Sequence, residues 1–187
     1  LFEGGGIANE YSDPTLENVT FSSNSADNGG GGMANSESDP LLTNVNFSLN
    51  DAGENGGGMQ NVYSDTDVTN VTFALNEAGE KGGGMANYYS SPTLTNLTFS
   101  GNSAEDGGGG IYNYGVESET SNPVITNSIL WENTPDQISN HDAFSIPIVT
   151  YSVVQGESVY PGEGNMNSDP LLDDLAEVAA LTRPVAF

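Results

Sequence analysis

The sequence predicts an all-β chain that folds as a right-handed parallel β-helix (β-solenoid), with about seven coils of 26 residues and three short strands per coil. Three observations lead to this prediction. A glycine triplet recurs at one fixed interval, columns of phenylalanine and asparagine keep the same interval, and the composition is rich in turn-forming residues, with 24 glycines and no cysteine.

The glycine triplets recur every 26 residues, at 4–6, 30–32, 56–58, 82–84 and 108–110. An apolar residue follows each triplet: Ile7, Met33, Met59, Met85 and Ile111. Glycine costs about 1 kcal/mol in a helix interior, so a helical repeat is excluded. A fixed period of this length is typical of stacked coils, in which equivalent residues lie ~4.7–4.9 Å apart.

Phenylalanine and asparagine occupy further columns with the same period. The phenylalanines are Phe21, Phe47, Phe73 and Phe99. One asparagine column is Asn18, Asn44, Asn70 and Asn96, and two others begin at Asn9 and Asn24. We expect the rings to form a continuous internal stack and the asparagines to form hydrogen-bonded ladders at the corners of the coils, because asparagine tolerates the left-handed conformation and its amide both donates and accepts.

Each unit contains three short extended pieces, such as "GGGIAN", "PTLEN" and "VTFSSN", and a turn such as "SDP" precedes the second. After Asn113 a five-residue insertion loosens the pattern. We therefore predict a β-helix over residues 1–172. Apolar residues at helical spacing near the end predict an irregular or short-helical cap over residues 173–187.

The charge is strongly negative, with 26 acidic and 2 basic residues and a formal net charge of −24. Such a surface disfavours binding to nucleic acid and to anionic membranes, because both are bound through lysine and arginine. No apolar run reaches the roughly 20 residues that span a bilayer, so membrane insertion is not expected. The absence of cysteine excludes disulfides and thiolate–metal sites.

The repeat resembles the right-handed parallel β-helix proteins of the pectate-lyase-like class. The pairing of "GGGI" or "GGGM" with "FSSN", "FSLN", "FALN" and "FSGN" is most similar to the GGA-[ILV] and F-x-x-N repeats of polymorphic outer-membrane proteins, with glycine in place of the usual alanine. The resemblance covers residues 4 to about 172. It implies a secreted or cell-surface location and a role in adhesion or surface structure.

Enzymes with this fold, by resemblance, use a lysine or arginine base with calcium, or clustered aspartates with a histidine. This chain offers Lys81, Arg183 and His141. Lys81 follows the stacked acids of its loop, and charge relief explains it more simply than catalysis does. An acidic cleft would also repel an acidic polysaccharide, so no catalytic residues are assigned and the sequence favours a non-enzyme.

Calcium is the cofactor that the acidic columns suggest. Glu54, Glu80 and Asp106 stack one coil apart, as do Asp13, Asp39 and Asp65 near another turn. Hard cations prefer carboxylate oxygens, and stacked like charges are unfavourable without a counter-ion. Solvated and screened acids are the alternative.

We therefore expect a non-catalytic extracellular structural or adhesive β-solenoid. Its strand edges suggest end-to-end self-association, including head-to-tail filaments. The alternative is a glycan-binding or polysaccharide-degrading module in which exposed tyrosines contact sugars; the candidates are Tyr63, Tyr88, Tyr89, Tyr112 and Tyr114.

Overall fold

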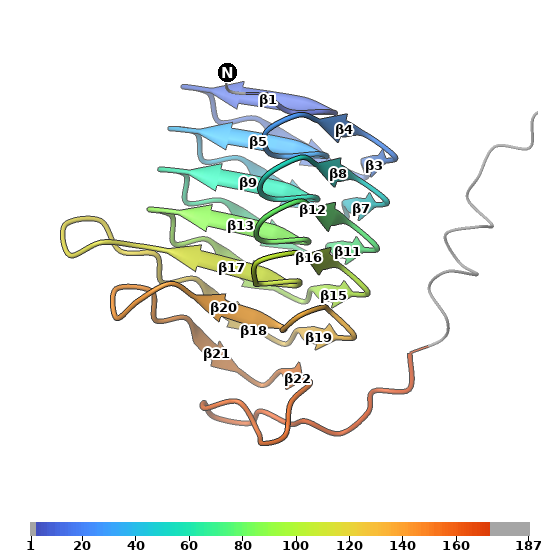
Figure 1. Ribbon diagram of the computed structural model, residues 1–187, viewed down its shortest axis with the longest axis vertical. Helices are drawn as coiled ribbons and strands as arrows, with labels where there is room; N and C mark the ends of the chain where they lie inside the picture. Colours follow the sequence, from blue (N-terminus) through green and yellow to red (C-terminus); the bar gives the residue numbers. More distant parts are fainter. Residues whose placement is uncertain (1–2, 173–187) are drawn as a thin grey trace, which may run out of the picture.

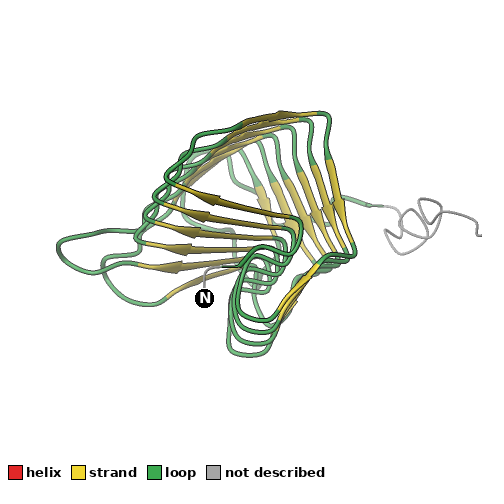
Figure 2. Ribbon diagram, turned by 90° about the horizontal axis from the view of Figure 1, so that it is seen from above, coloured by secondary structure: helices red, strands yellow, loops and turns green. Residues whose placement is uncertain are grey.

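The computed structural model describes residues 3–172, and these form a parallel β-solenoid without any helix. Its coils stack along one axis, with the N-terminal coil at the top of Figure 1. Seen from the N-terminal end, the chain winds clockwise away from the viewer (Figure 2), so the solenoid is right-handed. The cap predicted for residues 173–187 lies outside the described residues.

The strands form four parallel sheets, which we call sheets A to D. Sheet A contains β1 (Ile7–Glu10), β5 (Met33–Ser36), β9 (Met59–Val62), β13 (Met85–Tyr88), β17 (Ile111–Tyr114) and β20 (Ile138–Asn140). Sheet B contains β2 (Thr15–Glu17), β6 (Leu41–Thr43), β10 (Asp67–Thr69), β14 (Thr93–Thr95), β18 (Val124–Thr126) and β21 (Ile148–Thr150). Sheet C contains β3 (Thr20–Ser22), β7 (Asn46–Ser48), β11 (Thr72–Ala74), β15 (Thr98–Ser100), β19 (Ile129–Trp131) and β22 (Val153–Val154). Sheet D contains β4 (Ser25–Ala26), β8 (Asp51–Ala52), β12 (Glu77–Ala78) and β16 (Ser103–Ala104).

The predicted fold class is confirmed, and the coil count is about six instead of seven. Sheets A, B and C each have six strands, while sheet D has four, so a coil contains three or four strands. The later coils change length: the hydrogen-bonded step is 31 residues between Leu97 and Ser128 and 24 between Ser128 and Ser152. The insertion before β18 forms a loop that projects from the stack in Figure 1.

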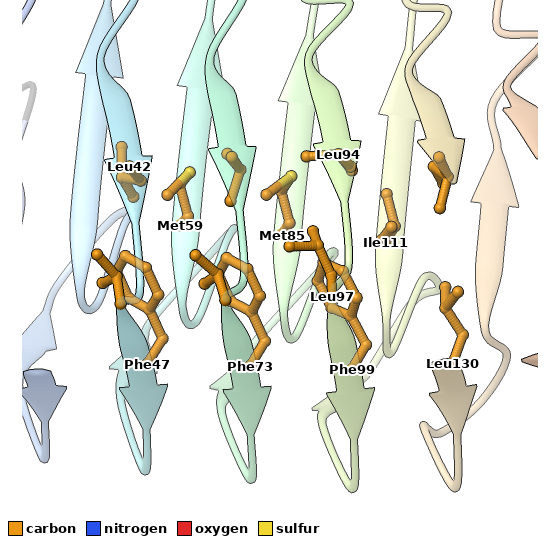
Figure 3. Close-up of a cluster of buried hydrophobic side chains, with 14 of the residues drawn as sticks. Leu42, Phe47, Met59, Phe73, Met85, Leu94, Leu97, Phe99, Ile111 and Leu130 are labelled. Carbon is orange, nitrogen blue, oxygen red and sulfur yellow. The ribbon is translucent and has the colours of Figure 1, made fainter. Parts of the chain in front are cut away.

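The core is built from columns of identical or similar side chains. Phe47, Phe73 and Phe99 have no exposed surface, and Leu130 takes the ring position in the next coil (Figure 3). The centroids of Phe47 and Phe73 lie 4.7 Å apart, and those of Phe73 and Phe99 4.6 Å apart, with nearly parallel planes. A methionine column from sheet A and a leucine and valine column from sheet B surround the rings.

The glycine triplets occupy positions that other residues do not fit, for two reasons. The first glycine of a triplet, such as Gly56, has a positive φ of 69°. The third glycine faces the phenylalanine stack: a Cβ on Gly58 would lie 2.8 Å from Cδ1 of Phe73. The triplet therefore allows both a sharp bend and close contact with the core ring.

Two asparagine columns lie inside the solenoid and link each coil to the next. In the first, Asn35 donates to Asn61 Oδ1 at 2.9 Å, and the same bond recurs along sheet A. In the second, Asn76 receives hydrogen bonds from the backbone and side chain of Asn50 and donates to the carbonyl of Phe47. Every buried side-chain polar atom of the described residues has a hydrogen-bond partner, as the low polarity of a core requires.

The two ends of the described stack differ. At the N-terminal end Ile7, Leu16 and Val19 are only partly buried, and the outer edges of β1 to β4 have no neighbouring strand in the structure. At the other end the segment 156–170 crosses the last coil. Asn165 accepts the backbone N–H of Ser152 at 3.0 Å, and Tyr160 packs against the core.

Candidate binding surface

A column of corner residues follows sheet A and projects outward from the coils. Its members are Tyr11, Glu37, Tyr63 and Tyr89, which have φ between 47° and 54°. The backbone N–H of Tyr63 donates to the carbonyl of Tyr88, and equivalent bonds hold the other members in register. Because each residue has the same left-handed conformation, the side chains leave the stack in the same direction.

All five tyrosines predicted for the alternative sugar site meet at this corner. Tyr63 stacks on Tyr89 with centroids 4.8 Å apart, and Tyr89 contacts Tyr114 edge-on at 5.3 Å. Tyr88 lies between Tyr112 and Tyr114, with centroid distances of 5.9 Å and 5.8 Å respectively. The five rings therefore form one continuous cluster, in which Tyr112 is buried beneath the others, and we call it the tyrosine surface.

Lys81 and His141 also belong to the tyrosine surface, although 60 positions separate them in the sequence. The Lys81 ammonium lies 5.5 Å from the centre of the Tyr112 ring, within range of a cation–π interaction. The Tyr112 hydroxyl lies 3.2 Å from Nδ1 of His141, and the imidazole packs on Tyr114 at 4.7 Å. This convergence is not visible in the sequence, because residue spacing does not place the loop after β20 beside β17.

Burial, with nearby carboxylates, favours the neutral form of Tyr88 and Tyr112. Burial is the main cause that raises the pKa of Tyr88 well above its ordinary value, and Glu80 and Glu54 add to it. Burial also raises the pKa of Tyr112, with smaller contributions from Tyr114 and Asp142. The Tyr88 hydroxyl donates to Asn55 Oδ1 at 2.8 Å. These phenols therefore act as hydrogen-bond donors at neutral pH.

The proposed calcium column is in register but forms no metal cluster in the described residues. The backbone N–H of Glu80 donates to the Glu54 carbonyl at 2.7 Å, and that of Asp106 donates to the Glu80 carbonyl at 2.7 Å. All three side chains are exposed. No group of three or more acidic, histidine or cysteine side chains within residues 3–172 is arranged to hold a metal ion.

The second acidic column has a structural explanation. The Asp13 carboxylate accepts the backbone N–H of Asp39 at 2.8 Å, and Asp39 accepts that of Asp65 at 2.6 Å. Asp65 in turn accepts the backbone N–H of Ser91. Each carboxylate thus caps the turn of the next coil, a charge-assisted bond that needs no metal.

The predicted asparagine ladder at residues 18, 44, 70 and 96 lies on the exposed corner between sheets B and C. These four residues have φ from 55° to 58°. Their amides contact one another at 3.1 to 3.3 Å, each donating toward the N-terminal neighbour. The buried ladders described above run in the opposite direction, from each coil to the next one along the chain.

A cavity of about 590 Å³ opens where sheet D ends, because the coil containing β19 is too short to supply a fifth strand. Asp136 and Gln137 line it. Asp136 Oδ1 accepts the backbone N–H of Gly108 at 3.1 Å, where the equivalent glycines of earlier coils donate to the backbone carbonyls of Asn55, Lys81 and Gly107. Burial raises the pKa of Asp136, and the bond from Gly108 opposes that effect.

Comparison with protein families, curated proteins and solved structures gives no significant match to the chain. None of the described residues forms a helix long and apolar enough to cross a membrane. Functional inference therefore rests on the solenoid and its surfaces.

Proposed function

We propose that the chain is a non-catalytic extracellular solenoid with a structural or adhesive role. The observation that supports this role is that the interior side chains repeat from coil to coil, whereas those at the outer corner vary. The interior columns repeat from coil to coil, whereas the corner column reads Tyr, Glu, Tyr, Tyr in successive coils. A rigid interior that holds different side chains at a spacing of ~4.8 Å suits the display of a binding surface.

The finer resemblance to the repeats of polymorphic outer-membrane proteins supports the extracellular location. The phenylalanine and asparagine of each F-x-x-N unit are both used, since the ring fills the core and the asparagine closes the ladder beside it. The test is protease treatment of intact cells that produce the protein. Degradation without lysis is expected, and full protection until lysis would contradict a surface location.

Adhesion is tested directly with fluorescently labelled protein on cells or extracellular matrix. We expect saturable binding that falls when Tyr63, Tyr89 and Tyr114 are replaced together by serine. The matched control replaces Tyr151, which is similarly exposed but lies outside the corner column and the five-ring surface. Equal loss in both variants, or no saturable binding by the unaltered protein, would contradict an adhesive role for this surface.

Head-to-tail filaments are the less favoured form of this role. The first coil presents strand edges and partly exposed core residues, which promote stacking. The segment 156–170, however, hydrogen-bonds to the last coil through Asn165 and Met166. A second copy would have to displace this segment before its first coil could stack there.

The second candidate is a glycan-binding or lyase-type module, and the meeting of Lys81, Tyr112 and His141 favours it. These side chains supply three groups that can donate or accept protons within one surface. Against it, the rings pack mainly on one another, and the net charge of −24 repels acidic polysaccharides. A lyase assay on acidic and neutral glycans separates the candidates: product formation that Lys81→Ala abolishes would replace the first proposal with the second.

A further inference from the structure

The exposed asparagine ladder at residues 18, 44, 70 and 96 carries a feature that its structural role does not require. In three of its four members a threonine follows two positions after the asparagine. The segments are Asn18-Val19-Thr20, Asn70-Val71-Thr72 and Asn96-Leu97-Thr98. Asparagine followed at this distance by threonine or serine is the acceptor motif for N-linked glycans in secreted proteins. All four asparagines of the ladder are exposed, as such a site requires.

The fold does not explain the threonine of this motif. It is the first residue of a sheet C strand, and the equivalent residues of successive coils are Thr20, Asn46, Thr72, Thr98, Ile129 and Val153. None of these side chains is buried. Because threonine, asparagine, isoleucine and valine all occupy the position, neither the strand nor the core selects a hydroxyl there.

The amide nitrogens of the ladder can be substituted without breaking it. An asparagine amide carries two hydrogens, and Asn70 Nδ2 uses one of them to donate to Asn44 Oδ1 at 3.3 Å. Asn96 Nδ2 donates in the same way to Asn70 Oδ1 at 3.1 Å. The side chains are exposed at the corner between sheets B and C. A group attached in place of the second hydrogen can therefore extend into solvent.

We propose that Asn18, Asn70 and Asn96 are acceptor sites for N-linked glycans. In the transfer, which an oligosaccharyltransferase catalyses, Nδ2 forms a bond to C1 of the first sugar of a lipid-pyrophosphate-linked oligosaccharide. The bond between C1 and the phosphate oxygen breaks, the lipid pyrophosphate leaves with the electron pair, and the amide loses one proton. Asn70 and Asn96 are one coil step of ~4.8 Å apart, so their first sugars compete for space and each site is occupied only in part.

Two neighbouring asparagines lack the required combination. Asn44 is exposed and has the same corner conformation, with a φ of 55°, but residue 46 is an asparagine and supplies no hydroxyl. Asn46 is followed by a serine at the right distance, but Ser48 is buried and donates to Ser22 Oγ at 3.2 Å. The chain therefore contains its own matched controls.

The inference rests on the proposed extracellular role, since this modification belongs to secreted proteins. It is compatible with contact through the tyrosine surface. Tyr63 and Tyr89 precede strands β10 and β14 of sheet B, whereas Asn70 and Asn96 follow them. The glycans therefore stand at the opposite end of sheet B from the tyrosine surface.

The experiment produces the whole chain in yeast behind a secretory signal peptide, so that the signal imposes the route. Peptide N-glycosidase in heavy-oxygen water then converts each modified asparagine of the secreted protein to a labelled aspartate, and mass spectrometry of its peptides locates the label. We expect label at Asn18 in most molecules, label at Asn70 and Asn96 in a smaller fraction, and none at Asn44.

Single substitutions separate the motif from the ladder. Thr72→Ala should remove the label at Asn70, and Thr72→Ser should retain it. Asn46→Thr completes the motif after Asn44, at a position where Thr72 and Thr98 show that threonine fits, and should create a new label at Asn44. Because these side chains are not buried, the melting temperatures of the deglycosylated variants should stay close to that of the unaltered protein.

Secreted protein without label at any of the three asparagines would overturn the proposal, as would label at Asn70 that persists in Thr72→Ala. Label at Asn46 equal to that at Asn18 would show that the motif alone selects the sites and would overturn their assignment to the ladder. Since the signal peptide imposes secretion, these outcomes do not depend on the natural location of the protein, which protease treatment of intact cells tests separately.

Discussion

At the residue scale, the same amino acid has different tasks according to its column. Asn76 is fully buried and joins three coils through its side chain, whereas Asn70 is exposed on the outer ladder. The sequence shows both columns with equal clarity, because both repeat without interruption. It does not show which column lies inside, since asparagine is polar in either place.

This difference predicts unequal effects of substitution. Asn76→Ala removes bonds to Asn50, Asn102 and the Phe47 carbonyl, and it leaves buried groups unpaired. We expect a loss of about 3–5 kcal/mol in the free energy of unfolding, because each buried polar group left without a hydrogen-bond partner costs ~1–3 kcal/mol. Asn70→Gly, which retains the left-handed backbone at φ 56°, should cost less than about 1 kcal/mol. Urea unfolding of both variants checks this, and similar losses would contradict the assigned difference.

At the element scale, the first four coils are each shaped by the contact between a glycine triplet and a phenylalanine ring. The coil of short strands could be predicted because its signals are local. They are a glycine that permits a bend, a proline turn and alternating apolar residues. The fourth strand was not predicted, since "SA", "DA" and "EA" are too short to show alternation. The meeting of Lys81 and His141 was also missed, because it depends on the conformation of a loop outside the repeat.

The contact between Gly58 and the Phe73 ring predicts that a smaller residue at 73 offsets part of the cost of a larger residue at 58. Gly58→Ala places a Cβ 2.5 Å from the Gly84 carbonyl oxygen and 2.8 Å from the Phe73 ring, and should cost about 1–3 kcal/mol by overpacking. Phe73→Leu has a precedent in Leu130, which occupies the equivalent position, and should cost about 1–2 kcal/mol. In the double variant the two costs should add only in part, because the smaller leucine relieves the contact with the ring but not the contact with the Gly84 carbonyl. A double-mutant cycle by urea denaturation measures this coupling, and strict additivity would assign the cost of Gly58→Ala to the Gly84 carbonyl instead of the ring.

Asp136, in the loop where sheet D ends, predicts that the stability of the fold depends on pH. Burial raises the pKa of Asp136 above its ordinary 3.8, so the folded state binds a proton more tightly than the unfolded state. Its contribution to stability is therefore fully present below pH 3.8 and is lost as pH rises through the folded-state pKa. The melting temperature of the unaltered protein minus that of Asp136→Asn should accordingly fall with rising pH across this window. A constant difference would mean that Asp136 has no raised pKa.

At the scale of the whole molecule, the interior is fully paired but the outside carries closely spaced like charges. Asp51 and Glu77 are direct neighbours in sheet D, and Glu54, Glu80 and Asp106 are stacked beside them. We expect the melting temperature to rise with sodium chloride, because screening weakens repulsion within ~8–10 Å. Calcium and magnesium should act equally at matched ionic strength if the ions only screen. An excess effect of calcium that Glu80→Gln removes would instead establish a specific calcium site.

The two ends of the described stack differ, and this difference predicts whether the chain stacks end to end. The first coil offers strand edges, but the last coil is engaged by Asn165, Met166 and Tyr160, so the unaltered protein should sediment as a single short rod at 0.15 M salt. Asn165→Ala combined with Tyr160→Ala loosens that segment and should produce self-association that increases with protein concentration and salt, since salt reduces repulsion between chains of net charge −24. The matched control, Tyr63→Ala, alters an exposed tyrosine that lies outside both the core and the segment 156–170. Analytical ultracentrifugation with electron microscopy distinguishes the outcomes. Filaments of the unaltered protein would show that a second copy readily displaces the C-terminal segment, and single rods in the double variant would show that this segment is not what prevents stacking.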